Sequence, residues 1–148
     1  MKRIERLVIH CTATPEGREV TAADIRRWHC SPAPVGRGWR QVGYTDIIHL
    51  DGSVERLVDN NEDPFVDSWE VTNGARGYNG TSRHIVYVGG CDRNGKPKDT
   101  RTQAQKDALL SYVKDFKAKY PWADVCGHNE LDPGKDCPCF DVRKEFGI

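Results

Sequence analysis

Residues 127–140, near the C-terminus, bring chemically reactive side chains close together. The stretch reads GHNELDPGKDCPCF and holds His128, Lys135, Cys137 and Cys139. Because its glycines and prolines interrupt a regular helix or strand, we expect an irregular loop here. A histidine nitrogen and a cysteine thiolate are both ligands that zinc accepts. The loop therefore predicts two ligands of a zinc site, and its spacing leaves the choice between the two cysteines open.

The start of the chain offers a third ligand. Leu7, Val8 and Ile9 form a short apolar run typical of a buried strand, and His10 follows it directly. Two histidines and one cysteine leave one position of a tetrahedral zinc site open, which is the pattern of catalytic zinc. Taken alone, His10 is also explained as a buried histidine bonded to nearby backbone, and only its combination with the later loop favours a metal. The remaining histidines lack such neighbours and are interpreted as surface or packing residues: His29, His49 and His84.

The rest of the sequence predicts helices and strands that alternate along the chain. Thr21 and Asp24 resemble a capping box that begins a helix ending near His29, and Thr102 with Gln105 forms a second capping box. The Asp51-Gly52 pair is a typical two-residue hairpin turn between strands at 44–50 and 53–57. Further strands are expected at 4–10, 84–88 and 124–127, further helices at 102–120 and 140–146, and irregular segments at 30–43, 60–79 and 92–100. The pattern predicts an α/β domain with a central mixed sheet.

Length and charge narrow the possible partners. The 148 residues fit one domain over 1–148. Lysine plus arginine and aspartate plus glutamate number 22 each, so we expect no nucleic acid and no acidic membrane as partner, because both attract surplus positive charge. The apolar run before His10 is far shorter than the apolar core of a signal peptide, about 7–15 residues. We therefore expect cytoplasmic synthesis, and cysteines that are free or metal-bound because the cytoplasm is reducing. We also expect a monomer.

Several motifs occur in a fixed order along the chain. They are VIHCTAT at 8–14, GYTDIIHLDG at 43–52, GARGYN at 74–79, VGG at 88–90 and GHNELDPGKDCPCFD at 127–141. Together they resemble the N-acetylmuramoyl-L-alanine amidase type 2 family, which includes bacteriophage lysozyme-type amidases and the peptidoglycan recognition proteins. The resemblance runs from Leu7 to Phe146. It implies a central sheet flanked by helices, with a zinc site at the floor of a surface groove.

The resemblance also implies roles for individual residues. It implies one zinc ion per chain, bound by His10, His128 and Cys137, with Tyr44 and Lys135 as the catalytic pair. The implied reaction is hydrolysis of the amide bond between N-acetylmuramic acid and L-alanine in peptidoglycan. An enzyme of this kind, made without a leader, would reach the cell wall after release or export, as a phage or prophage endolysin does. The candidate substrate-binding residues lie in the GARGYN motif: Gly74, Ala75, Arg76 and Asn79.

The chain departs from the family pattern at a few positions. Relatives commonly carry histidine where this chain has Gly74 and Thr45. Arg83 and His84 stand where small or apolar residues are usual, and Cys139 stands where a small residue such as serine is usual. The last departure favours Cys139 as a space-filling residue. The others concern the groove and the sheet, and leave the predicted ligands intact.

Two other functions are compatible with parts of the sequence. A peptidoglycan-binding module without activity would share the motifs, but loss of a ligand would mark it, and all three predicted ligands are present. A cysteine peptidase would use Cys137 or Cys139 with His128, since a cysteine and a histidine suffice for nucleophilic attack. We favour the zinc amidase.

Overall fold

The computed structural model describes residues 2–148, and its central sheet has strand order β5-β4-β7-β2-β9. These strands are β2 (Arg6–Cys11), β4 (Asp46–Ile48), β5 (Val54–Arg56), β7 (Ser82–Tyr87) and β9 (Asp124–Gly127). β2 lies parallel to both β7 and β9, and β7 is also parallel to β4. β5 pairs antiparallel with β4. The sheet is mixed, which confirms the predicted fold class.

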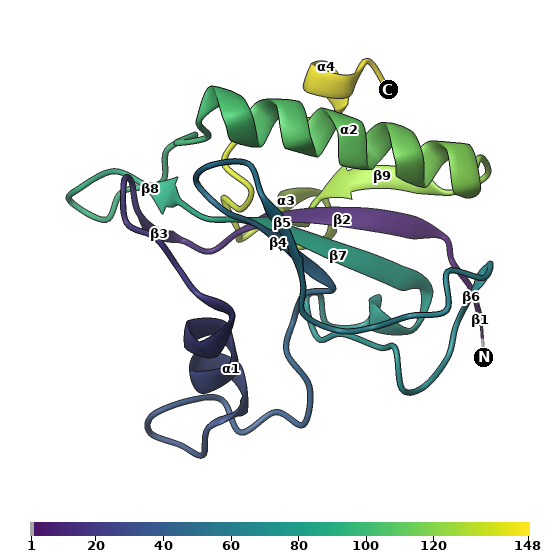
Figure 1. Ribbon diagram of the computed structural model, residues 1–148, viewed down its shortest axis with the longest axis horizontal. Coiled ribbons are helices and arrows are strands. Elements are labelled where there is room, and N and C mark those ends of the chain that lie inside the picture. The colour runs from purple at the N-terminus through teal and green to yellow at the C-terminus, as the bar shows by residue number, and fades with distance from the viewer. Residues whose placement is uncertain (1) are drawn as a thin grey trace.

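Helices cover both faces of this sheet. α2 (Gln103–Lys119) lies along one face, and α1 (Ala22–Cys30) lies on the opposite side (Figure 1). Leu109, Val113 and Phe116 of α2 pack in one apolar cluster with Leu7 and Ile9 of β2. A second cluster joins α1 to β4 and β7 through Ile25, Ile47 and Val86, among others. Parallel strands that are covered on both faces are buried along their length. β2 and β7 are buried almost throughout, and each has a short apolar run, at 7–9 and at 85–87.

Both predicted capping boxes are present. The Thr21 side chain accepts a hydrogen bond from the Asp24 backbone N–H at 3.1 Å, and the Asp24 carboxylate accepts one from the Thr21 N–H at 3.0 Å. Thr102 and Gln105 make the same reciprocal pair at the start of α2. Each pair satisfies N–H groups that the first turn of a helix leaves without partners.

The hairpin and the C-terminal segment differ in detail from the sequence prediction. His49 bonds to Ser53, so the turn contains three residues rather than two, and Gly52 adopts φ +85° in it. Residues 127–140 were expected to be wholly irregular, but His128–Leu131 form one helical turn, α3. Its N-terminus is closed by the Glu130 carboxylate, which accepts a hydrogen bond from the Gly127 N–H. The predicted closing helix is α4 (Val142–Phe146).

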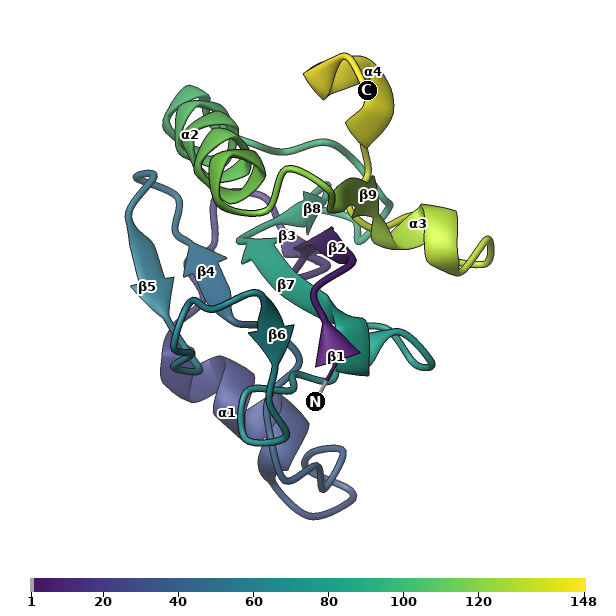
Figure 2. The same ribbon diagram turned by 90° about the vertical axis from the view of Figure 1, so that its right-hand side faces the viewer.

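Short elements complete the fold. β1 (Lys2–Arg3) pairs with β6 (Phe65–Val66), β3 (Thr14–Pro15) pairs with β8 (Gly90–Cys91), and Asn79–Thr81 form a 3-10 turn. Figure 2 shows α3 and α4 beside β9, at the edge of the sheet opposite β5. The six cysteines are free thiols. Within residues 2–148, the helices are too short or too polar to cross a membrane.

Candidate metal centre

The parallel pairing of β2 and β9 brings two of the predicted ligands together. Ile9 pairs with Gly127, so the carboxyl ends of the two parallel strands lie next to each other. His10 follows Ile9 within β2, and His128 follows Gly127 as the first residue of α3. The two imidazole rings lie in an edge-on arrangement, with centroids 4.7 Å apart. The sheet register therefore determines that these histidines meet.

Cys137 returns to the same place from the loop after α3. The Asn129 N–H donates to the Cys137 carbonyl at 2.8 Å, which ties the loop to α3. The Cys11 N–H donates to the Cys137 sulfur at 3.2 Å, and this sulfur lies 3.7 Å from Nδ1 of His10. One ligand atom from each of His10, His128 and Cys137 lies within 4.8 Å of the others. The structure thus brings all three predicted ligands together.

This donor set suits zinc. Zn–N and Zn–S bonds of about 2.1 and 2.3 Å at a tetrahedral angle place nitrogen and sulfur about 3.6 Å apart. The separation of 3.7 Å between His10 Nδ1 and the Cys137 sulfur agrees with that requirement. The backbone N–H on the sulfur supports a thiolate. Cys139 turns elsewhere: its sulfur lies 3.9 Å from that of Cys11 and 3.3 Å from the Gly90 carbonyl oxygen.

Burial keeps the histidines of the centre neutral. It lowers the pKa of His10 well below the ordinary value and lowers the pKa of His84 to about 3. The pKa of His128 is lowered first by burial and then by the positive charge of Lys135. Neutral imidazoles are the form that binds a metal. The pKa shifts therefore favour ligation.

Tyr44 lies beside the histidines. Its ring centroid is 5.1 Å from that of His10 and 5.3 Å from that of His29. His29 also holds the residue before Tyr44, because the Gly43 N–H donates to His29 Nδ1 at 2.9 Å. Burial raises the pKa of Tyr44. The hydroxyl therefore stays protonated at neutral pH and can donate a hydrogen bond.

Lys135 is exposed in the turn that links α3 to Cys137. Its backbone N–H donates to the Asp132 carbonyl at 3.0 Å, which shapes this turn. Its charge contributes to the lowered pKa of His128, so the ammonium acts on the centre electrostatically. The position is compatible with a cation that approaches a bound substrate.

The GARGYN motif lies next to His84, which in turn contacts His10. Ala75 is buried, and its N–H donates to the Asn79 side-chain oxygen at 2.9 Å. A Cβ atom at Gly74 would lie 2.5 Å from Nδ1 of His84. Arg76 is exposed, whereas Asn79 is half-buried. The predicted substrate-binding role of this motif, and the predicted groove, stay predictions.

His84 was interpreted from the sequence as a surface or packing residue, and that interpretation is incomplete. It is fully buried, and its Nδ1 lies 2.8 Å from Nε2 of His10. The available signal was a paired departure from the family pattern. This chain has glycine at position 74, where relatives commonly carry histidine, and histidine at position 84, where small or apolar residues are usual. In the fold these two positions touch.

A second group of possible ligands consists of carboxylates. Oxygen atoms of Asp63, Asp67 and Glu70 lie within 4.8 Å of one another. Glu70 is buried and already paired with Arg83, whose Nη2 lies 3.3 Å from the carboxylate. The guanidinium thus supplies positive charge where a cation would have to bind. These residues are better explained as a structural ion pair with acidic neighbours.

Known protein sequences resemble this chain over nearly its whole length. A family model described as N-acetylmuramoyl-L-alanine amidase matches residues 1–140. The endolysin of Escherichia phage T7 is 36% identical over 140 residues, which cover 95% of this chain and 83% of that protein.

Comparison with solved structures gives the same fold. N-acetylmuramoyl-L-alanine amidase LysC from Clostridium intestinale URNW has a TM-score of 0.74 at 20% identity, covering 99% of this chain and 87% of that one. The Ph2119 endolysin from a Thermus scotoductus MAT2119 bacteriophage has a TM-score of 0.72 at 26% identity, covering 100% of this chain and 88% of that one.

Proposed function

The chain belongs to the N-acetylmuramoyl-L-alanine amidase family, and we propose that it cleaves peptidoglycan with one zinc ion bound by His10, His128 and Cys137. The bond is the amide between N-acetylmuramic acid and L-alanine. The observation that carries the proposal is the convergence of these three ligand atoms within 4.8 Å. The similarity to phage endolysins supports action on the cell wall.

The protein contributes three ligands and leaves one position open. When bound, zinc supplies a Lewis acid for the scissile carbonyl and activates a water molecule for attack at neutral pH. His10 and His128 bind as neutral imidazoles, which their burial supports. Cys137 binds as a thiolate, which the Cys11 N–H supports. The open position is the feature that separates a catalytic from a structural site.

Tyr44 and Lys135 assist as hydrogen-bond donor and cation. The Tyr44 hydroxyl stays protonated, so it can orient the attacking water or the oxygen on which negative charge develops. The Lys135 ammonium stabilises the same charge, and one donor of this kind is typically worth about 10²–10³ in rate. Within the GARGYN motif, Arg76 is exposed and can contact the substrate, whereas Gly74, Ala75 and Asn79 are partly or fully buried.

The active unit is a single domain that acts as a monomer on peptidoglycan. We place its synthesis in the cytoplasm and its action at the cell wall after release or export. Nucleic acid is not a partner in this proposal, because positive and negative side chains balance at 22 each.

Digestion of purified peptidoglycan tests the reaction. Mass spectrometry of the products should show stem peptides with a free L-alanine amino group and glycan chains without new reducing ends. New reducing sugar ends, or intact material, would contradict the amidase assignment.

Inhibition separates the amidase from the cysteine peptidase alternative. A strong zinc chelator should abolish cleavage, and added zinc should restore it. The Cys139 thiol is a poor nucleophile, because its hydrogen bond to Cys11 and its burial raise its pKa. Activity that survives the chelator and disappears with a thiol alkylator would favour the peptidase.

A further inference from the structure

Four groups form a continuous hydrogen-bonded row behind His10. The Ala75 N–H lies 2.9 Å from Oδ1 of Asn79, and this oxygen lies 3.0 Å from Nε2 of His84. His84 Nδ1 then lies 2.8 Å from His10 Nε2. The row ends at His10 Nδ1, which faces the Cys137 sulfur at 3.7 Å. It connects the backbone of the GARGYN motif to the metal centre.

The sheet holds the two histidines in reach of each other. In the β2–β7 pairing, Val8 is opposite His84 and His10 is opposite Val86, so the two imidazoles are diagonal neighbours on one face. Gly74 leaves the space that the His84 ring occupies, since a Cβ there would lie 2.5 Å from Nδ1. His84 is fully buried, so water does not compete for its nitrogens.

The direction of the row follows from its first member. A backbone N–H can only donate, so the Asn79 atom that it contacts must be the carbonyl oxygen. That oxygen accepts, and His84 Nε2 must therefore carry a proton. Burial disfavours a charged imidazole, so His84 has a single N–H and its Nδ1 is an acceptor. His10 Nε2 must then carry the proton, which leaves the Nδ1 lone pair of His10 free.

We propose that Asn79 and His84 are positioning residues that fix the tautomer of His10, so that Nδ1 is the nitrogen that faces the metal. A neutral histidine without such a partner exchanges between two tautomers and rotates about its side-chain bonds. Partners that orient a ligating histidine typically change metal affinity by about 10- to 100-fold. This inference rests on the metal site of the proposed function. It also assigns Asn79 to support of the metal centre rather than to substrate contact.

Three variants test the row through zinc affinity. His84→Leu removes the acceptor while keeping an apolar volume, and its affinity for zinc should fall about 10- to 100-fold in competition with a chromophoric chelator. His84→Asn places a side-chain oxygen near the position of Nδ1 and should recover part of the loss. His49→Leu is the matched control, because His49 lies away from the centre and bonds to Glu19 and Glu55. Its zinc affinity should equal that of the wild type.

A second measurement reads the tautomer without any variant. Long-range ¹H–¹⁵N spectra of wild-type protein with labelled histidine should show the His10 proton on Nε2 before and after zinc is added. A proton on Nδ1, or His84→Leu that folds and binds zinc as tightly as the wild type, would overturn the proposal. A wild type that binds no zinc would instead remove the proposed metal site, and the spectrum of the zinc-free protein would still decide the tautomer.

Discussion

At the scale of single residues, Cys137 and Cys139 show how position separates two identical side chains. The Cys137 sulfur faces His10 at 3.7 Å, whereas the Cys139 sulfur faces Cys11 and Gly90. Cys137→Ser should lose zinc, because a hydroxyl is a far weaker zinc ligand than a thiolate. Cys139→Ser should keep about one zinc per chain and most of the activity. Metal analysis of both purified variants checks this, and the reverse pattern would show that the wrong thiol was assigned.

Lys135 is an exposed lysine whose loss should matter only for catalysis. If its ammonium stabilises charge that appears in the transition state, Lys135→Ala should lower kcat about 10²-fold, with little change in bound zinc. Lys135→Arg should restore only part, since a planar guanidinium places its donors differently. Rates and zinc content are measured on the same preparations.

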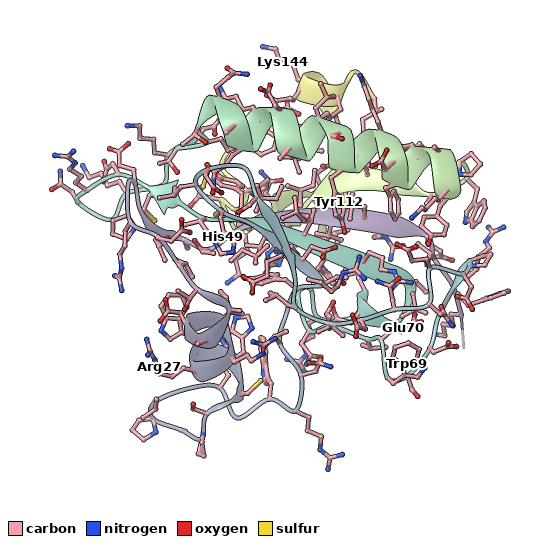
Figure 3. All side chains as sticks on the ribbon, in the orientation of Figure 1. Arg27, His49, Trp69, Glu70, Tyr112 and Lys144 are labelled. Atoms are coloured by element: carbon pink, nitrogen blue, oxygen red, sulfur yellow. The ribbon has the colours of Figure 1, made fainter. Side chains whose placement is uncertain are left out.

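Lys144→Ala is the matched control for Lys135. Lys144 extends from α4 into solvent (Figure 3), and its removal should leave kcat unchanged. A Lys135→Ala enzyme within a few-fold of the wild type would leave Tyr44 and the metal to account for catalysis.

The residues of the site could be predicted to different degrees. His10, His128 and Cys137 follow from the motifs, and the structure brings their ligand atoms together. Their neighbours His84 and His29 could not be found in this way. His10 and His84 are 74 residues apart in sequence, and their contact depends on the register of β2 and β7. No local pattern encodes such a register.

At the scale of elements, α2 is held to the sheet by a polar contact as well as by its apolar face. Gln105 is fully buried, and its amide nitrogen lies 3.0 Å from the Val88 carbonyl oxygen and 3.3 Å from that of Ile48. Its side-chain oxygen also accepts a hydrogen bond from the Thr102 N–H. The same residue thus caps the helix and bonds the residues that follow β7 and end β4. Tyr112, which is farther along α2 (Figure 3), donates a hydrogen bond to the Asp46 carboxylate of β4.

Gln105→Leu should destabilise the fold while leaving the metal centre in place. It leaves the buried Val88 carbonyl oxygen without its partner, and one such group costs about 1–3 kcal/mol. Gln103→Leu is the control, since Gln103 is exposed and bonds only to Asp107 across one helical turn. Urea unfolding of the zinc-loaded proteins should show a lower midpoint for Gln105→Leu alone. Equal midpoints would show that the polar contact contributes nothing.

Elements with local signals were predicted best. The capping boxes at Thr21 and Thr102 identify the start of both long helices, because the reciprocal bonds involve residues three apart. The single turn of α3 was missed, since glycine and proline in the same segment favour a loop. Its stability comes from Glu130, which closes the turn, and from the bond between Asn129 and Cys137. Those contacts depend on the surrounding fold.

At the scale of the whole molecule, neutral histidines link function to stability. Burial lowers the pKa of His10, His84, His29 and His128 below the ordinary value. Metal binding requires neutral rings. Because the unfolded chain binds protons that the folded chain does not, the fold also loses stability in acid. His29 provides the cleanest test, because it is not a proposed ligand and burial, with a smaller effect of Arg37, lowers its pKa to about 4.

Between pH 6.5 and about 4, the unfolded chain binds a proton at His29 and the folded chain does not. The free energy of unfolding should therefore fall as pH falls through this window, by at most about 1.4 kcal/mol per pH unit for one residue. His29→Asn can still accept the Gly43 hydrogen bond, and its free energy of unfolding should fall less steeply with pH than that of the wild type at equal zinc.

His49→Asn is the control of opposite sign, since burial lowers the pKa of His49 but Glu19 and Glu55 raise it to a greater extent. The stability from His49 is present below pH 6.5 and is lost as pH rises through the raised pKa, so its removal should leave the acid slope intact. Urea titrations from pH 4 to 7 measure all three, and identical slopes for the wild type and His29→Asn would contradict the neutral buried ring.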